Sequence, residues 1–235
     1  MHIFYTPDLT EKHTTYLLSE EESKHCIKVL RLDIGTQVVL VDGNGRRAVA
    51  AIVSAHPKRT NLEILSFEHN VEKRNHQLHI AIAPTKNIER FEWFLEKATE
   101  IGINIITPIL CSRSERKEIK IERLNKRITA AMKQSLKAYH PQLNEIVTIV
   151  DFLKQPQSGQ KFIAHCMEGK KKSLSEMIIP HSSYTILIGP EGDFTPLEIE
   201  EAQRLGFDPI TLGTSRLRTE TAALAACFEV NYINR

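Results

Sequence analysis

The chain has 235 residues, of which 41% are hydrophobic and 26% are charged, and its formal net charge is +2. These values are typical of a globular protein and exclude a disordered or fibrous chain. No apolar run approaches the ~20 residues that cross a bilayer, and the N-terminus lacks a signal-peptide pattern. The four cysteines have neither C-x-x-C pairing nor metal-ligand spacing. We therefore expect a cytoplasmic protein with reduced cysteines and no metal.

Residues 1–70 favour a small β-rich domain. Two apolar segments, 38–41 and 48–53, flank the turn residues 42–45. This pattern predicts a hairpin, because Asp-Gly and Asn-Gly tolerate a positive φ. Residues 62–65 alternate like a further strand.

A helix is expected to interrupt these strands. Ser19 is a suitable N-cap, and Glu22 completes the capping box. Lys28 and Arg31 follow near the end of this helix, where they either meet RNA phosphates or form an ordinary solvated face. Residues 68–77 are polar without apolar periodicity and are predicted to be a linker.

A change of period marks the second region, 71–235. A buried strand at residues 78–83 precedes a helix that begins after Asn87, and a second strand follows at residues 105–110. Pro108 places the second strand near an edge or an end of its sheet. Strand, helix and strand in this order predict a parallel α/β sheet.

Residues 111–140 carry a strong positive charge. They hold nine lysines and arginines against three glutamates, a net charge of +6. A basic helix of this kind is typical of a nucleic-acid contact, although an exposed amphipathic helix has the same pattern. Strands are expected at residues 146–150 and 161–166. His165, near the end of the second strand, is either close to a pocket or a structural histidine.

Two glycine turns, at residues 189–194 and 212–218, each follow a short apolar run and lead into a helix. The first helix carries a capping box and an N1 proline at Thr195, Pro196 and Glu198. The last helix is expected from about residue 219. Strand, glycine turn and helix leave backbone N–H groups free at the C-terminal edge of a sheet, where small ligands bind.

We expect the two turns to follow neighbouring strands and to form one pocket. Residues 191–201 hold five acidic side chains and no basic one, so a polyphosphate would be repelled. A neutral or cationic ligand fits better, and an ordinary tight connection is the alternative.

The motifs of these turns resemble those of the RsmE family, the ribosomal RNA small subunit methyltransferases E of the SPOUT class. Residues 188–195 read IGPEGDFT and residues 212–222 read LGTSRLRTETA. The corresponding motifs of the family are IGPEGG-F-S/T and LG-R-I-L-R-x-E-T-A. This chain departs from the family at Asp193, usually glycine, and at residues 215–217. Residues 97–102, KATEIG, extend the resemblance.

The resemblance implies an α/β fold with a C-terminal trefoil-knotted methyltransferase domain, residues 71–235, and a small N-terminal PUA-like RNA-binding β-barrel, residues 1–70. It implies a homodimer that uses S-adenosyl-L-methionine to methylate N3 of a uridine in 16S ribosomal RNA of the small subunit. In this interpretation the cofactor is bound by backbone at Ile188, Gly189, Pro190, Glu191, Gly192, Leu212, Gly213 and Leu217.

Two catalytic residues follow from the same motif. Arg218 is expected to stabilise the developing uracil anion. Glu220 either orients Arg218 or caps the last helix, and no general base is assigned. The RNA-binding candidates are Lys28, Arg31, Arg113, Lys133 and Lys137. The alternatives are a 2′-O-ribose tRNA methyltransferase of the same class and a non-catalytic RNA-binding protein.

Overall fold

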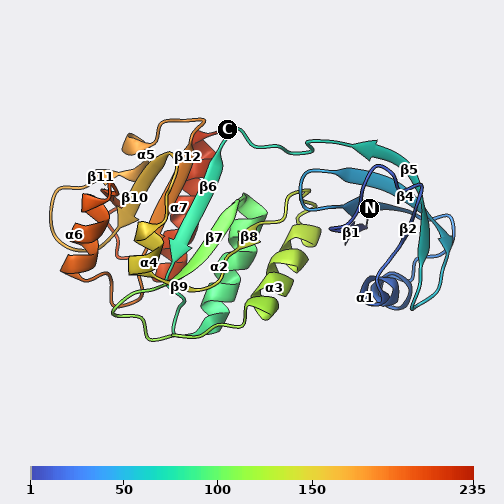
Figure 1. Ribbon diagram of the computed structural model, residues 1–235, viewed down its shortest axis with the longest axis horizontal. Helices are drawn as coiled ribbons and strands as arrows, with labels where there is room; N and C mark the ends of the chain where they lie inside the picture. Colours follow the sequence, from blue (N-terminus) through green and yellow to red (C-terminus); the bar gives the residue numbers. More distant parts are fainter. Residues whose placement is uncertain (1) are drawn as a thin grey trace. The chain divides into compact units, whose positions relative to one another are not determined.

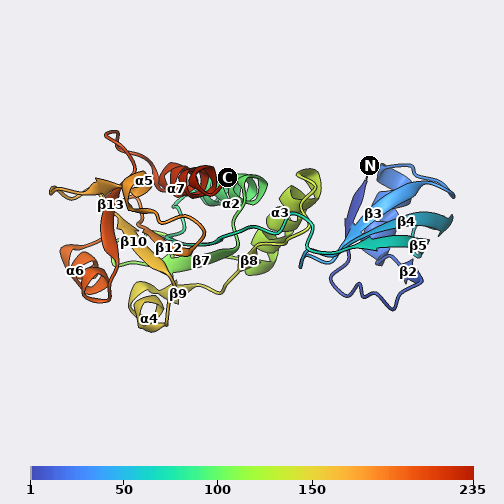
Figure 2. The same cartoon turned by 90° about the horizontal axis from the view of Figure 1, so that it is seen from above.

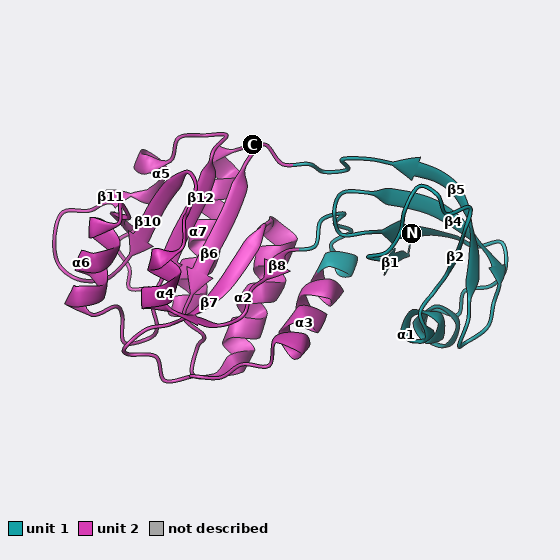
Figure 3. Ribbon diagram, viewed as in Figure 1, with its two compact units in different colours: residues 1–73, 132–140 teal, residues 74–131, 141–235 magenta. Residues whose placement is uncertain are grey.

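The computed structural model describes residues 2–235 and divides into two compact units (Figures 1 and 3). The first comprises Met1–Lys73 and Met132–His140, and the second Arg74–Ala131 and Pro141–Arg235. The chain thus returns to the first unit after it has begun the second. Within residues 2–235, no helix has the length and the apolar character to span a membrane.

A five-stranded sheet of order β1-β3-β4-β5-β2 forms the first unit. The strands are β1 Ile3–Tyr5, β2 Thr15–Leu17, β3 Gln37–Val41, β4 Arg47–Ser54 and β5 Asn61–Glu68. Antiparallel pairing of β3 with β4 confirms the predicted hairpin. The predicted helix is confirmed as α1 Glu20–Lys24, and the Ser19 hydroxyl accepts the Glu22 N–H. The other half of the predicted capping box is not found within residues 2–235, because the Glu22 carboxylate accepts from Lys133 instead. A π-helical turn, η1 His25–Val29, continues it.

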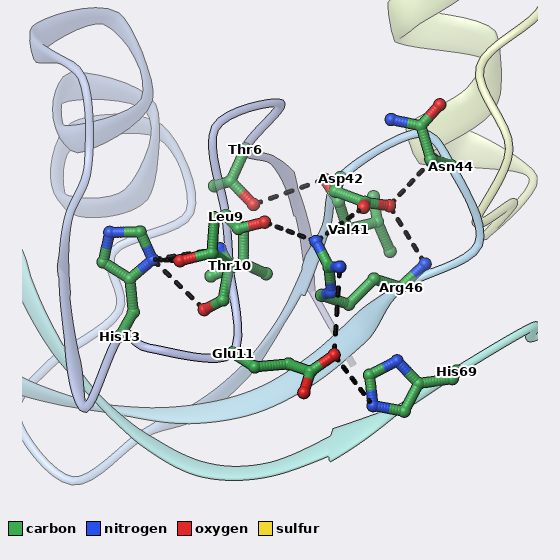
Figure 4. A network of polar contacts seen from close by, with 10 residues as sticks. All are labelled: Thr6, Leu9, Thr10, Glu11, His13, Val41, Asp42, Asn44, Arg46 and His69. Atoms are coloured by element: carbon green, nitrogen blue, oxygen red, sulfur yellow. Dashed lines mark hydrogen bonds and ion pairs between the residues drawn. The ribbon is translucent and has the colours of Figure 1, made fainter.

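Asp42 organises the hairpin turn (Figure 4). One oxygen of this buried carboxylate accepts the N–H groups of Asn44 and Arg46 at 2.7 and 3.0 Å. The other accepts the Arg46 guanidinium at 3.1 Å, which also donates to the carbonyl of Leu9 at 2.7 Å. The carboxylate therefore fixes the turn and links it to the N-terminal segment.

The returning segment, 132–140, packs against the same sheet. Met132 and Ala138 are buried in one cluster with Ile3, Val39 and Val41. This segment completes the hydrophobic core of the first unit.

An eight-stranded parallel sheet forms the second unit, in the order β11-β13-β10-β12-β6-β7-β8, with β9 pairing β7. Its strands are β6 Gln77–Ile82, β7 Ile105–Leu110, β8 Gln142–Leu143, β9 Val147–Thr148, β10 Gln160–Ala164, β11 Lys172–Ser173, β12 Ser183–Ile188 and β13 Asp208–Thr211. Its helices are α2 Ile88–Ile101, α3 Ile121–Gln134, α4 Ile149–Lys154, α5 Leu174–Met177, α6 Pro196–Arg204 and α7 Thr219–Ile233. The end of α3 belongs to the first unit. Every strand pair is parallel, as predicted.

Helices cover both faces of this sheet: α2, α5 and α7 lie on one side, and α4 and α6 on the other (Figure 2). Ala223 and Ala226 of α7 are fully buried, so small side chains bring this helix close to its neighbours. The apolar residues on the two faces form separate clusters.

One predicted strand is wrong in extent. Residues 146–150 form only β9, because the Thr148 hydroxyl accepts the Asp151 N–H at 3.1 Å and starts α4 there. Pro108 lies on β7, second from the edge, where β8 and β9 pair with the residues before and after it. Proline is tolerated at this gap in the pairing.

Candidate active site

Three parallel strands end at one edge of the sheet beside the two glycine turns. The order β13-β10-β12 places β10 between the strands that carry the turns. The expectation that these strands are neighbours is therefore wrong, because β10 lies between them. The residues after β10, including His165 and Cys166, fill the position between the two turns.

The first turn is shaped by two conformational requirements. A Cβ at Gly189 would lie 3.1 Å from the Phe194 ring, so glycine permits a close approach. Asp193 has φ +62°, the left-handed region that glycine, asparagine and aspartate tolerate best. Its carboxylate accepts the N–H groups of Phe194 and Cys166, both at 2.8 Å. Aspartate thus adopts the left-handed conformation at the position where the family motif has glycine, and its carboxylate ties the turn to the residue Cys166 that follows β10.

Two further contacts brace this turn from outside. Glu191 accepts the backbone N–H of Lys86 at 2.9 Å. Arg113, a sequence candidate for RNA contact, donates to the carbonyl oxygens of Gly192 and Phe194 at 2.9 and 3.3 Å. Its guanidinium therefore already has acceptors within the protein.

The second turn leaves its backbone donors free. Gly213 has φ +117° and faces open space at the position of a Cβ. In the part of the chain that the structure describes, residues 2–235, the N–H groups from Gly213 to Leu217 donate to no protein acceptor. The Thr219 hydroxyl donates to the Gly189 carbonyl at 3.0 Å and joins the start of α7 to the first turn.

Two adjoining cavities lie between these segments. One has a volume of about 560 Å³ and the other about 240 Å³. The larger one falls in the range of ~300–1,000 Å³ that is usual for ligand sites. All eight residues predicted to bind the cofactor line one cavity or the other: Ile188, Gly189, Pro190, Glu191, Gly192, Leu212, Gly213 and Leu217. The site thus offers donor-rich backbone and space for a ligand of cofactor size.

His165 lines the larger cavity. Burial lowers its pKa, and the nearby Lys171 ammonium lowers it further, while Asp193 acts in the opposite direction. Lys171 is itself held by the His165 carbonyl at 2.9 Å. Among residues 2–235 there is no group of three or more His, Cys, Asp or Glu side chains placed to bind a metal ion.

A third cavity, of about 640 Å³, lies beside α2 and the start of α7. Arg218 and Glu220 both line it, together with Arg90 and Trp93, which sequence reasoning missed. The expected pairing of Glu220 with Arg218 is not found, because the ion pair of Glu220 is with Arg90, at 3.9 Å. Arg218 is exposed, and its side chain has no ion pair or hydrogen bond within residues 2–235.

The candidate RNA contacts differ in how free they are. Lys133 donates to both oxygens of Glu22 at 2.7 and 2.9 Å, so it serves the packing of the first unit. By contrast, Lys28, Arg31 and Lys137 have no side-chain partner in the described chain, residues 2–235. Two other cations of the basic helix, Arg123 and Arg127, pair with the buried Glu92.

Comparison with known proteins identifies both parts of the chain. An RNA methyltransferase domain matches residues 72–231, and an RNA methyltransferase PUA domain matches residues 18–65. A ribosomal RNA small subunit methyltransferase E from Mesomycoplasma hyopneumoniae (strain 232) is 34% identical over 181 residues, which cover 74% of this chain and 77% of the relative.

Two solved structures share the whole fold. A crystal structure described as a probable rRNA-methyltransferase from Porphyromonas gingivalis has a TM-score of 0.91 and 38% identity, covering 100% of this chain and 98% of the other. A ribosomal RNA small subunit methyltransferase E from Neisseria gonorrhoeae, bound to S-adenosyl methionine, has a TM-score of 0.88 and 27% identity, with 100% and 98% coverage. These matches confirm the predicted class, an α/β protein with an N-terminal PUA-like domain. The chain belongs to the ribosomal RNA small subunit methyltransferase E family.

Proposed function

We propose that this enzyme transfers the methyl group of S-adenosyl-L-methionine to N3 of a uridine in 16S ribosomal RNA of the small subunit. The observation that carries the proposal is the cavity between the two glycine turns, with its unused backbone donors at Gly213–Leu217. The related Neisseria gonorrhoeae enzyme was crystallised with S-adenosyl methionine.

We propose that main-chain groups bind the donor, at Ile188–Gly192 in the first turn and at Leu212, Gly213 and Leu217 in the second. When bound there, S-adenosylmethionine supplies an electrophilic methyl group on a cationic sulfur. Asp193 is the single carboxylate among the residues that line the larger cavity, and its two backbone hydrogen bonds fix its position. Its negative charge favours a cationic sulfur placed directly beside it, while three cations, Arg113, Lys171 and Arg216, also line this cavity.

Arg218 is proposed to act on the uracil. N3 of uracil carries a proton, and its loss leaves an anion that a nearby guanidinium stabilises. Arg218 is suited to this role because it is exposed, lines both the smaller donor cavity and the third cavity, and is not engaged by a protein acceptor within residues 2–235.

The RNA-binding residues, the knotted domain, the dimer and the location of the enzyme also belong to this proposal. We propose that residues 1–70 bind ribosomal RNA through Lys28 and Arg31, aided by Lys137 of the returning segment. We propose that residues 71–235, apart from that segment, form the trefoil-knotted catalytic domain. A homodimer is supported by the stacked rings of Phe228 and Tyr232 on α7, which are 52% and 60% exposed. We also propose a cytoplasmic location, which a ribosomal RNA substrate supports.

Nucleoside mass analysis of ribosomal RNA from a deletion strain tests the function. Loss of N3-methyluridine from 16S RNA, restored by the intact gene, supports the proposal. Loss of a ribose 2′-O-methyl from tRNA favours the related knotted methyltransferase instead. Unchanged RNA from both sources favours a non-catalytic RNA-binding protein, which calorimetry with S-adenosylmethionine would then examine.

Arg218→Ala tests the proposed mechanism. We expect the variant to bind S-adenosylmethionine within a few-fold of the parent, because backbone groups make the proposed contacts. Turnover should fall by about 10²–10³-fold, the usual effect of removing one charge-stabilising donor. Calorimetry and a methyl-transfer assay on 16S RNA measure the two quantities, and full turnover in the variant removes Arg218 from the mechanism.

A further inference from the structure

We propose that the third cavity receives the target uracil and that the Glu220 carboxylate accepts the N3 proton during methyl transfer. This inference rests on the proposed function and supplies the general base that the sequence did not reveal. It is carried by the side chain of Glu220, which is deeply buried and incompletely hydrogen-bonded.

Glu220 is only 6% exposed, yet its Oε2 has no hydrogen-bond partner among residues 2–235. The other oxygen, Oε1, lies 3.9 Å from Nε of Arg90, which is an ion pair but too long for a hydrogen bond. A buried carboxylate oxygen without a partner is unfavourable in the free protein. A ligand N–H that enters this cavity would satisfy it, and uracil N3 carries such a group.

The surroundings of Glu220 are rich in positive charge. It is the second residue of α7, a helix of 15 residues, whose N-terminal end carries a partial positive charge. Arg90 of α2 and Arg216 and Arg218 of the preceding loop also line the cavity, against one other carboxylate, Glu89. The unpartnered Oε2 of Glu220 is a hydrogen-bond acceptor, so it is matched to an N–H on the substrate.

Trp93 supplies a second feature of a base site. It lines the same cavity from α2 and is 43% exposed, so its indole has a free surface. Unpaired bases in RNA are commonly held by stacking on aromatic side chains. The cavity volume, about 640 Å³, is sufficient for a nucleotide withdrawn from its stack.

The base cavity and the donor cavities share a wall. Arg216, Leu217 and Arg218 line both this cavity and the smaller donor cavity, and Leu217 and Arg216 line the larger one as well. This short segment is therefore the place where the base and the methyl group meet.

The step balances without a further reactant. The N3–H bond breaks and its proton passes to Glu220, while the electron pair left on N3 forms the new bond to the methyl carbon. The carbon–sulfur bond breaks and its electron pair stays on sulfur, which loses its positive charge. Glu220 then returns the proton to water, and Arg218 stabilises the negative charge on the uracil in transit.

Glu220→Gln tests the proposal, because glutamine keeps the shape of the side chain but cannot take the proton. We expect kcat to fall by about 10²–10⁴-fold, the usual contribution of a general base. S-adenosylmethionine binding should stay within about twofold by calorimetry, since Glu220 lines neither donor cavity. The residual rate should rise about tenfold per pH unit as hydroxide replaces the lost base.

An RNA substrate with a more acidic N3 distinguishes a catalytic role of Glu220 from a structural one. RNA that carries 5-fluorouridine at the target needs less help in losing its proton. The Glu220→Gln variant should therefore recover by about tenfold or more relative to the parent enzyme on this RNA. A merely structural role for Glu220 predicts no such recovery.

Two companion variants complete the design. Trp93→Ala should weaken binding of the target RNA by about 5–150-fold, the range for one stacked base, while cofactor affinity is unchanged. Glu96→Gln, on the same helix but outside the cavity, removes one carboxylate that pairs with Lys97 and should leave activity unchanged.

The outcomes are distinguishable. A parent enzyme that forms no N3-methyluridine overturns the proposed function itself. If the parent is active, a Glu220→Gln variant with the parent's rate, or a slow one without recovery on 5-fluorouridine RNA, overturns the role of Glu220. Should Glu220→Gln fold poorly, Glu220→Asp replaces it: a retained base predicts the parent's pH profile at a lower rate, and a steep profile contradicts the inference.

Discussion

At the scale of single residues, His79 links the pH of the solution to stability. Its Nε2 lies 2.7 Å from the Thr107 hydroxyl, and its ring meets Phe152 edge-on at 5.4 Å. Burial lowers the pKa of His79 to about 4, although a hydrogen bond with Gln157 acts in the opposite direction. The folded protein therefore holds this histidine neutral where the unfolded chain binds a proton.

The sign of the effect follows from proton counts. Between about pH 6.5 and 4 the unfolded state binds more protons at His79, so stability falls as the pH falls through this window. The full loss is on the order of 3 kcal/mol. Urea unfolding at pH 7, 5.5 and 4.5 measures it. His79→Gln should show a shallower dependence than the parent, and an equal slope in both proteins would exclude His79 as the source.

Residue identity predicted the lining of the site better than it predicted the partners of charged side chains. The eight cofactor candidates were implied by the resemblance to the family motifs, and all of them line the cavities at the sheet edge where both glycine turns lie. Arg113 and Lys133, however, bond to groups 79 and 111 positions away in the chain. No local pattern reveals such partners, and the same limit hid the pairing of Arg90 with Glu220.

At the scale of elements, α6 is held by one carboxylate at its first turn. Glu198 accepts the N–H and hydroxyl of Thr195 through Oε2, at 2.7 and 3.0 Å. Through Oε1 it accepts the N–H and hydroxyl of Ser112 at 2.8 and 3.1 Å. Burial raises the pKa of Glu198, but these hydrogen bonds outweigh it and leave the pKa below its usual value. The helix cap thus also anchors the loop after β7.

Glu198→Ala should therefore destabilise the protein by about 2–3 kcal/mol, since it removes a cap and leaves buried donors unpaired. Glu200→Ala, at an exposed position of the same helix, should change the free energy of unfolding by no more than about 0.5 kcal/mol. Urea denaturation at pH 7 compares the two, and equal effects would show that the contacts of Glu198 contribute little.

Elements with explicit end signals were predictable, and those without them were not. The boundaries of α1, α2 and α6 follow their caps at Ser19, Asn87 and Thr195. Residues 146–150 have strand propensity throughout, yet Thr148 ends the strand because its hydroxyl caps α4. β-branched threonine suits both roles, so tertiary context decides between them.

At the scale of the whole molecule, the chain passes from the first unit to the second, returns to the first and then re-enters the second. The sequence-based division at residue 70 implies a single passage. Residues 132–140 complete the core of the first unit through Met132 and Ala138. The charge of the basic helix α3 predicts a nucleic-acid contact, but near its end Met132 packs into the core of the first unit. Periodicity within a helix does not reveal which unit each turn packs against.

The proposed RNA-binding surface consists of Lys28, Arg31 and Lys137, which all belong to the first unit and have no side-chain partner within residues 2–235. It can therefore be tested as one group. Their joint replacement by alanine should weaken binding of 16S RNA without changing the fold. Each lost phosphate contact lowers the slope of log affinity against log salt by about 0.7, so the triple variant should lose about 2. Filter binding from 50 to 300 mM salt measures both quantities.

Lys133→Ala is the matched control. It leaves the Glu22 carboxylate in the first unit without its ion-pair partner, so it should lower the free energy of unfolding and leave the salt slope unchanged. The opposite result is an unaltered slope in the triple variant and a reduced slope in Lys133→Ala. It would mean that RNA binds Lys133 in competition with Glu22, and that Lys28, Arg31 and Lys137 do not contact the RNA.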